Sequence, residues 1–202
     1  FFLVASNSVF SRNVNALIKD QTAALRGEIV GEEYIVFGSS DVKEVVQKIV
    51  KTRPDVILNT INGDSNVAFF QALRKAGITP QDIPTISFSI AEPEIRTLGA
   101  KLVMGDYAAW NYFQSIPTPE NKAFVSSFKA KYGADQVTDD PMEAGYFGVY
   151  LWAQAVEMTK DPDPKLVRKA LLNQSFLAPE GIVYVDEENQ HTWKTVRIGK
   201  IN

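Results

Sequence analysis

The sequence predicts an α/β fold in which a parallel sheet carries helices on both faces, a doubly wound arrangement. Short apolar runs begin near residues 1, 29, 55 and 84, and amphipathic stretches separate them. The runs lack a strict alternation of apolar and polar residues, which is typical of strands buried on both faces. Their spacing of about 27 residues leaves room for a helix between successive strands, so right-handed parallel crossovers are expected.

The elements of the first hundred residues follow from these patterns. Strands are predicted at 1–5, 28–37, 56–58 and 85–89. Helices are predicted from about residue 11 to Gly27, from an N-cap at Ser39 or Ser40 to Pro54, at 65–76 and at 93–98. Apolar residues at helical spacing predict the buried faces of the first two helices: Val14, Leu17, Ile18 and Leu25 in one, and Val42, Val45, Val46, Ile49 and Val50 in the other.

After residue 101 the pattern changes from alternating elements to consecutive helices. A strand-like aromatic run at 102–113 precedes helices predicted at 119–132, 141–160 and 164–173, and then strands at 181–185 and 192–198. The long middle helix has Asp140 as its expected N-cap. One face of that helix carries Met142, Tyr146, Val149, Tyr150 and Ala153. The three helices have no sheet of their own in this sequence, so we expect them to dock on the first lobe or on a sheet from a longer polypeptide.

The composition excludes several classes of protein. The 202 residues carry a formal net charge of −3, 45% hydrophobic residues and no cysteine. Disulfides, thiolate zinc sites and a cysteine nucleophile are therefore excluded. No apolar stretch approaches the roughly 20 residues of a membrane span. The sequence has no cluster of Lys and Arg, which argues against a nucleic-acid partner.

Motifs of catalysis are missing from the sequence. The turn at 6–11 lacks the glycine pattern of dinucleotide sites, and neither a P-loop nor a nucleophile elbow occurs. His191 is the single histidine, so a two-histidine metal site is excluded. The acidic run at 139–143 could bind Mg²⁺ or Ca²⁺, but helix N-termini favour the same residues. We assign no catalytic residue, no metal ligand and no cofactor.

The loops that follow the four strands form the candidate binding site, because ligands of open α/β sheets bind at the carboxyl ends of the strands. These loops, at 6–8, 39–41, 62–65 and 89–92, are rich in hydroxyl and amide groups. Such groups donate and accept hydrogen bonds without carrying charge, which suits a small, polar, largely neutral ligand. The alternative is that these residues only cap helices.

Five stretches resemble the urea-binding proteins of bacterial ABC transporters. These proteins belong with the short-chain amide and branched-chain amino-acid binding proteins of the type I periplasmic class. The resemblance runs over essentially all 202 residues. The stretches that carry it are 62–70 (NGDSNVAFF), 89–92 (SIAE), 109–116 (AWNYFQSI), 139–144 (DDPMEA) and 188–194 (ENQHTWK).

The resemblance implies two Rossmann-like lobes that are joined by a hinge and close on a ligand between them. Residues 1–112 would form most of the C-terminal lobe, residues 113–180 would add helices to the N-terminal lobe, and residues 181–202 would recross the hinge and return to the C-terminal lobe. The implied hinge residues are Tyr112, Gln114, Ser115 and Gly181.

The ligand contacts that the resemblance implies are Ser6, Asn7, Ser8, Asn62, Ser89 and Ile90. The family's turn after the first strand resembles Ser-Asp-Tyr, whereas this chain has Ser6-Asn7-Ser8. The acid and the tyrosine of the family are thus both replaced.

The implied protein is a solute-binding subunit, periplasmic or lipid-anchored outside a Gram-positive cell. It would capture urea or a short-chain amide, deliver it to the membrane permease of an ABC importer, and catalyse nothing. The alternatives are a cytoplasmic amide-sensing regulator of the same fold, a branched-chain amino-acid binding protein, or an enzyme built on a doubly wound sheet.

Overall fold

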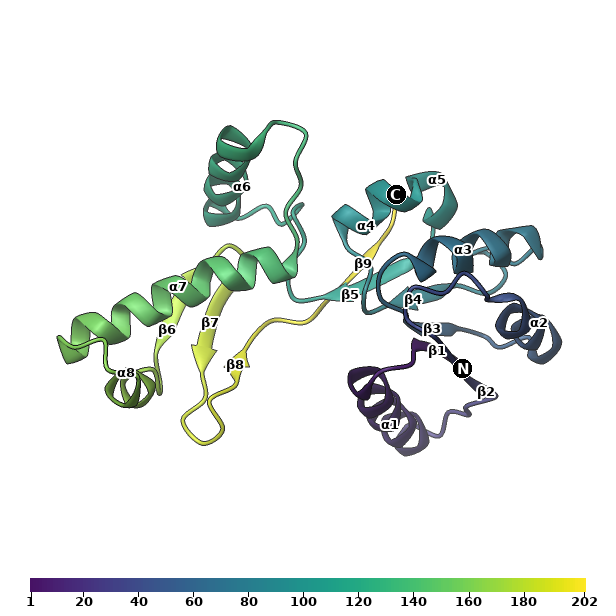
Figure 1. The fold of residues 1–202 in the computed structure, drawn as a ribbon, viewed down its shortest axis with the longest axis horizontal. Helices are drawn as coiled ribbons and strands as arrows, with labels where there is room; N and C mark the ends of the chain where they lie inside the picture. Colours follow the sequence, from purple (N-terminus) through teal and green to yellow (C-terminus); the bar gives the residue numbers. More distant parts are fainter. The chain divides into compact units, whose positions relative to one another are not determined.

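A computed structural model describes the whole chain, residues 1–202 (Figure 1). The chain forms two compact units. The first unit comprises residues 1–109 and 198–202, and the second comprises residues 110–197. None of the helices combines the length and the apolar character that crossing a membrane requires.

The first unit is built on a six-stranded sheet with the order β2-β1-β3-β4-β5-β9. Its strands are β1 (Phe2–Ser6), β2 (Gly31–Ile35), β3 (Ile57–Thr60), β4 (Thr85–Ser87), β5 (Tyr107–Trp110) and β9 (Arg197–Lys200). The strands from β1 to β5 pair in parallel, with Phe2 opposite Gly31 on one side and Ile57 on the other. The predicted α/β fold with a parallel sheet is confirmed.

Helices cover both faces of this sheet. They are α1 (Val9–Ala24), α2 (Lys43–Thr52), α3 (Ser65–Lys75), α4 (Glu92–Leu98) and α5 (Ala100–Val103). Figure 1 shows α1 on the opposite side of the strands from α3. The main core lies on the side of α2 and α3, where Phe2 and Val4 pack with Ile49 and Phe70. Because side chains alternate along a strand, Leu3 and Ala5 face the other side, and both are also buried.

The buried face predicted for α1 is only partly correct, since Val14 and Ile18 are half-buried but the two leucines are not. Leu17 and Leu25 are 69% and 73% exposed, whereas the buried residues of α1 are Ser11, Asn15 and Thr22. Hydrogen bonds explain this orientation. The Ser11 hydroxyl donates to the Thr60 carbonyl oxygen at 3.4 Å, and the Asn15 amide donates to side chains of β2 at 3.3 Å. Polar contacts with the sheet therefore determine which side of α1 faces inward.

The predicted start of α2 is wrong. The helix begins at Lys43, its N-cap is Val42, and no side chain caps it. Ser39 instead accepts a hydrogen bond from the backbone N–H of Asp41 at 3.0 Å, which makes a local turn before the helix. The predicted apolar face of α2 is buried except for Val50, which is exposed.

The second unit combines three helices with a small antiparallel sheet. Its elements are α6 (Pro119–Tyr132), α7 (Asp140–Thr159), α8 (Pro164–Ala170), β6 (Ser175–Ala178), β7 (Gly181–Val185) and β8 (Thr192–Trp193). The strand order is β6-β7-β8. Figure 1 shows α7 running across β6 and β7. The core of this unit consists of Phe147, Leu151, Ala178, Val183 and Val185.

The sequence predicted the three helices of this unit but not the details of α7. Its N-cap is Asp139, whose side chain accepts from the backbone N–H of Met142 at 2.9 Å, so Asp140 is already inside the helix. The predicted apolar face is not the buried one, because β6 and β7 pack on another row of side chains. That row consists of Asp140, Glu143, Phe147, Leu151 and Ala155, whereas Met142, Val149 and Tyr150 are exposed.

The two units do not divide the chain where the resemblance places the lobe boundaries. The units divide at 109/110 and 197/198, and the expected lobe boundaries are 112/113 and 180/181. Residues 181–185 form β7, whose residues Gly181–Tyr184 pair with β6. This strand therefore stays with the helices of the second unit. The assignment of residues to lobes stays a prediction.

Candidate functional site

Three predicted ligand residues meet at the carboxyl edge of the parallel sheet. Ser6 ends β1, Asn62 follows β3, and Ser89 follows β4. The backbone N–H of Asn62 donates to the Ser6 hydroxyl oxygen at 2.9 Å, and the Ser89 hydroxyl donates to the carbonyl oxygen of Ile61. The loops after three neighbouring strands are thus fastened to one another by the small polar residues that the sequence singled out.

The other predicted ligand residues have different positions. Ser8 caps α1, because its hydroxyl accepts from the backbone N–H of Ser11 at 3.1 Å. Asn7 is exposed, and its side-chain oxygen Oδ1 accepts from Nε and Nη2 of Arg12 at 3.2 and 2.9 Å. The side chain of Ile90 is fully buried in the main core. Asn7, Asn62 and Ser89 keep accessible side-chain surface, whereas Ser6 and Ile90 do not.

A buried amide network beneath this edge was missed at the level of sequence. Asn59 Nδ2 donates to Asn66 Oδ1 at 3.0 Å and to Ser87 Oγ at 3.1 Å, and its Oδ1 accepts from the backbone N–H of Ile61 at 2.9 Å. Asn66 Nδ2 donates to the carbonyl oxygen of Ile61 at 2.7 Å. The network holds the loop after β3 in place. The available signal was an asparagine at the end of an otherwise apolar strand.

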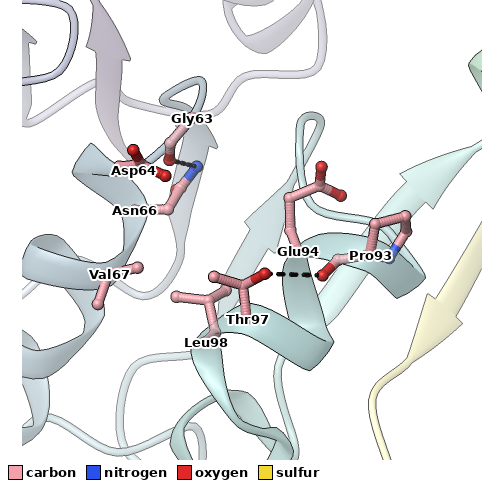
Figure 2. Close-up of a pocket in the computed structure, with 8 residues that line it drawn as sticks. All are labelled: Gly63, Asp64, Asn66, Val67, Pro93, Glu94, Thr97 and Leu98. Carbon is pink, nitrogen blue, oxygen red and sulfur yellow. Dashed lines mark hydrogen bonds between the residues drawn. The ribbon is translucent and has the colours of Figure 1, made fainter.

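A cavity of about 150 Å³ lies beside this network, between the first turn of α3 and α4 (Figure 2). Its lining residues are Gly63, Asp64, Asn66, Val67, Pro93, Glu94, Thr97 and Leu98. Figure 2 shows the Gly63 carbonyl oxygen accepting from the Asn66 amide at 3.3 Å, and the Thr97 hydroxyl donating to the Pro93 carbonyl oxygen at 3.2 Å. None of the six predicted ligand residues lines the cavity. It is smaller than the roughly 300–1,000 Å³ of ordinary ligand pockets.

An exposed aromatic ring also lies at this edge. Phe37, just after β2, is 66% exposed. Its Cζ would lie 3.7 Å from a Cβ built on Gly63, so the ring approaches the loop after β3. Gly63 has a φ of +69°, a conformation that favours glycine.

The predicted hinge residues all belong to the second unit. Tyr112 is buried, and its hydroxyl hydrogen-bonds to Asn121 Oδ1 and Thr138 Oγ1, both at 2.7 Å. Gln114 Oε1 accepts from the backbone N–H of Thr138 at 3.0 Å. Ser115 is exposed, and Gly181 opens β7. Their role in a hinge stays a prediction.

The residues considered for catalysis or metal binding are dispersed. His191 is exposed in the turn between β7 and β8, and its backbone N–H donates to Asn189 Oδ1 at 2.8 Å. In the acidic run, Asp139 caps α7 and Asp140 forms an ion pair with Lys194 at 3.0 Å. The structure contains no group of three or more His, Cys, Asp or Glu residues that could hold a metal ion.

Two curated relatives share part of their length with this chain. Leu/Ile/Val-binding protein homolog 6 of Brucella melitensis biotype 1 is 21% identical over 180 residues, which is 87% of this chain and 46% of that protein. Limonene hydroxylase of Geobacillus stearothermophilus is 35% identical over 105 residues, which is 52% of this chain and only 19% of that protein.

A solved structure and a family model match the whole chain. The structure is a solute binding protein of an ABC transporter from Rhodopseudomonas palustris HaA2 in complex with p-hydroxybenzoic acid. It superposes with a TM-score of 0.90 at 22% identity, covering 100% of this chain and 55% of that one. The chain thus spans about half the length of this protein, and the likeness shows the fold. The model of the family described as periplasmic binding protein domain matches residues 1–202, so the chain belongs to this family.

Proposed function

We propose that this chain is part of the solute-binding subunit of an ABC importer and that it captures urea or a short-chain amide between two hinged lobes. The subunit would lie in the periplasm, or outside a Gram-positive cell on a lipid anchor, and would deliver its solute to a membrane permease. Ligand binding would shift the equilibrium between open and closed lobes. The carrying observation is that Ser6, Asn62 and Ser89 gather uncharged polar groups at the carboxyl edge of the sheet.

The chemistry of these groups matches that of an amide. Urea offers N–H donors and one carbonyl acceptor. The Asn62 side chain can both donate and accept, and the Ser89 oxygen can accept an N–H while its own proton points to Ile61. In a site closed to water, a ligand polar group without a hydrogen-bond partner in the protein would weaken binding. The uncharged groups at this edge therefore favour a neutral ligand.

A branched-chain amino acid is the second candidate ligand. The name of the Brucella relative supports it. An amino acid carries a carboxylate, which requires a cationic partner or several N–H donors. Arg12 is a cation at this edge, held by Asn7 and placed 4.2 Å from the centroid of the Tyr34 ring. The two candidates therefore differ in whether Arg12 contributes to binding.

Calorimetry on the full-length gene product, with urea, acetamide and leucine as separate titrants, tests the proposal. We expect saturable heat with urea or acetamide. Asn62→Ala should weaken that binding about tenfold, through a lost hydrogen bond in a dry site. The control Ser127→Ala, at an exposed position of α6, should leave it unchanged.

The outcomes separate the candidates. Saturable heat with leucine alone, abolished by Arg12→Met, would move the protein to the amino-acid branch. The absence of heat with all three compounds would reject both candidates.

A further inference from the structure

Three buried carboxylates surround a half-buried lysine in the second unit. Asp140 and Glu143 come from α7, Glu180 from the turn between β6 and β7, and Lys194 from the segment after β8. Glu143 and Glu180 are 0% and 1% exposed. Lys194 Nζ lies 3.0 Å from Asp140 Oδ1 and 3.5 Å from Glu180 Oε2. Buried charges of this kind require partners, because their transfer out of water is costly.

Asp140 has its full set of partners. Besides Lys194, its Oδ2 accepts from the backbone N–H groups of Asn111 and Tyr112, both at 2.9 Å. A second cation, Arg197, donates to the carbonyl oxygens of Asn111 and Glu180. These contacts bring together the segments by which the chain enters and leaves the second unit, at 110–112 and 194–197.

Three of the four side-chain oxygens of the two glutamates have no hydrogen-bond donor. Glu143 Oε1 accepts one hydrogen bond, from the backbone N–H of Glu180 at 3.3 Å. Glu143 Oε2 and both side-chain oxygens of Glu180 are buried without a hydrogen-bond partner. With every group ionised, three carboxylates would face two cations, Lys194 and Arg197. A single proton would balance the charges and supply a missing donor.

We propose that Glu143 and Glu180 share a proton in the folded protein, and that losing this proton weakens the anchoring of the segments that enter and leave the second unit. The proton resides on Glu143, and the Glu180 carboxylate stays ionised, with its Oε2 3.5 Å from Lys194 Nζ. The switch needs no ligand, so it goes beyond the proposed transport function.

The titration of the pair gives the sign of the effect. Burial, and then the charge of Glu180, raise the pKa of Glu143 from its ordinary value of 4.5 to about 7. Burial also raises the pKa of Glu180. A raised folded-state pKa means that the folded protein binds the proton more tightly than the unfolded chain. Stability is therefore lost as the pH rises from about 4.5 to 7.

Tryptophan fluorescence reports mainly on this unit, because Trp152 and Trp193 lie within it, whereas Trp110 lies at its first residue, at the end of β5. We propose thermal unfolding of the 202-residue chain and of Glu143→Gln between pH 5 and pH 8. Glutamine is the neutral isostere of the protonated acid. The ratio of the wild-type to the variant unfolding constant should rise on the order of 50-fold between these two pH values.

A matched control is Glu157→Gln, at an exposed position of the same helix, which should keep the wild-type pH dependence. The proposal is overturned if the unfolding temperature of Glu143→Gln depends on pH as that of the wild type does. It is also overturned if the substitution shifts the unfolding temperature equally at pH 5 and pH 8.

A measurement on the wild-type chain covers the case in which Glu143→Gln does not fold. Carboxyl ¹³C NMR should show a glutamate signal from the pair that titrates near neutral pH. If every glutamate titrates below pH 5.5, the proposal is rejected.

Discussion

At the scale of single residues, Asn59 determines the shape of the candidate site although it cannot touch a ligand. It is fully buried, and its amide joins the ends of β3 and β4 to α3. Asn59→Ala would leave the Ile61 N–H and Asn66 Oδ1 without these partners. We expect the free energy of unfolding of the first unit to fall by about 2–4 kcal/mol.

Guanidinium unfolding followed by far-UV circular dichroism measures this loss, and amide exchange of Ile61 locates it. Gln47→Ala, at an exposed position of α2, is the control and should change the stability by less than about 0.5 kcal/mol. Equal effects of the two substitutions would show that the network does not hold the loop.

The Arg74–Asp106 ion pair gives a second prediction at this scale. Asp106 is fully buried, pairs with Arg74, and accepts from the backbone N–H of Thr85 at 2.9 Å. Burial raises its pKa in spite of the arginine. Arg74→Met would strand the carboxylate, and we expect a loss of about 3–5 kcal/mol at pH 7.

Two measurements check this prediction. The loss should shrink as the pH falls, because protonation neutralises the stranded carboxylate. Adding Asp106→Asn, which keeps an acceptor for the Thr85 N–H, should restore a large part of the stability. A loss that is independent of pH and of the second substitution would contradict this account.

Sequence could place the loops of the candidate site but not orient each residue within them. Ser6 and Ser89 follow apolar strands, and parallel strands end at one edge, so their proximity was predictable. Whether Ser89 or Ile90 faces inward depends on the course of the chain beyond β4, which the pattern of residues does not specify. The Asn59 network could not be predicted for a similar reason. Hydrogen bonds between side chains that are far apart in the sequence produce no periodic pattern of residues.

At the scale of elements, sequence predicted where helices occur better than which face each one buries. In α1 the buried face was set by hydrogen bonds from Ser11 and Asn15 to the sheet, not by its apolar stripe. In α7 apolar residues surround the helix, so periodicity cannot select one side. The strand β6 was not predicted, and its pairing with β7 stabilises it.

The turn between β6 and β7 depends on the backbone of Gly181, whose φ is +121°. A Cβ would meet no atom within 4 Å, so any cost of Gly181→Ala comes from the backbone conformation alone. We expect Gly181→Ala to destabilise the second unit by about 1–2 kcal/mol. Thermal unfolding followed by tryptophan fluorescence measures the change.

The matched control for this substitution is Gly145→Ala. Gly145 lies inside α7 and also has no atom within 4 Å of its Cβ position. There the helix propensity of alanine should stabilise the unit by about 0.5–1 kcal/mol. If Gly181→Ala lowers the stability and Gly145→Ala raises it, the cost at Gly181 comes from backbone strain and not from steric crowding. Stability changes of the same sign at both positions would reject the strain argument.

At the scale of the whole molecule, composition excluded classes of protein, whereas long uninterrupted motifs indicated the family. The identity of the solute does not follow in the same way. The residues at the carboxyl edge of one sheet indicate the polarity of a ligand but do not identify it. The chain spans about half the length of the Brucella relative and of the superposed structure. Contacts supplied by other parts of such proteins leave no trace in the residues of this chain.

The surface of the second unit leads to the last prediction. Several large apolar side chains of this unit are exposed, including Val149, Trp152, Met158, Leu177 and Ile182. Val149 and Trp152 lie three residues apart on α7, and Leu177 pairs with Ile182 across β6 and β7. Neighbouring exposed apolar side chains of this kind often mark sites that another surface covers. We therefore expect the 202-residue chain to bind a hydrophobic dye and to self-associate, as measured by dye fluorescence and light scattering.

Substitutions can assign this behaviour to the second unit. Val149→Lys and Trp152→Lys place charges on α7 and should reduce both dye binding and self-association, because a charge cannot be buried there without a partner. Val50→Lys, at an exposed position of α2, is the control and should leave both unchanged. A monodisperse monomer that binds no dye would contradict the expectation that another surface covers these side chains. The helices would then need no further sheet.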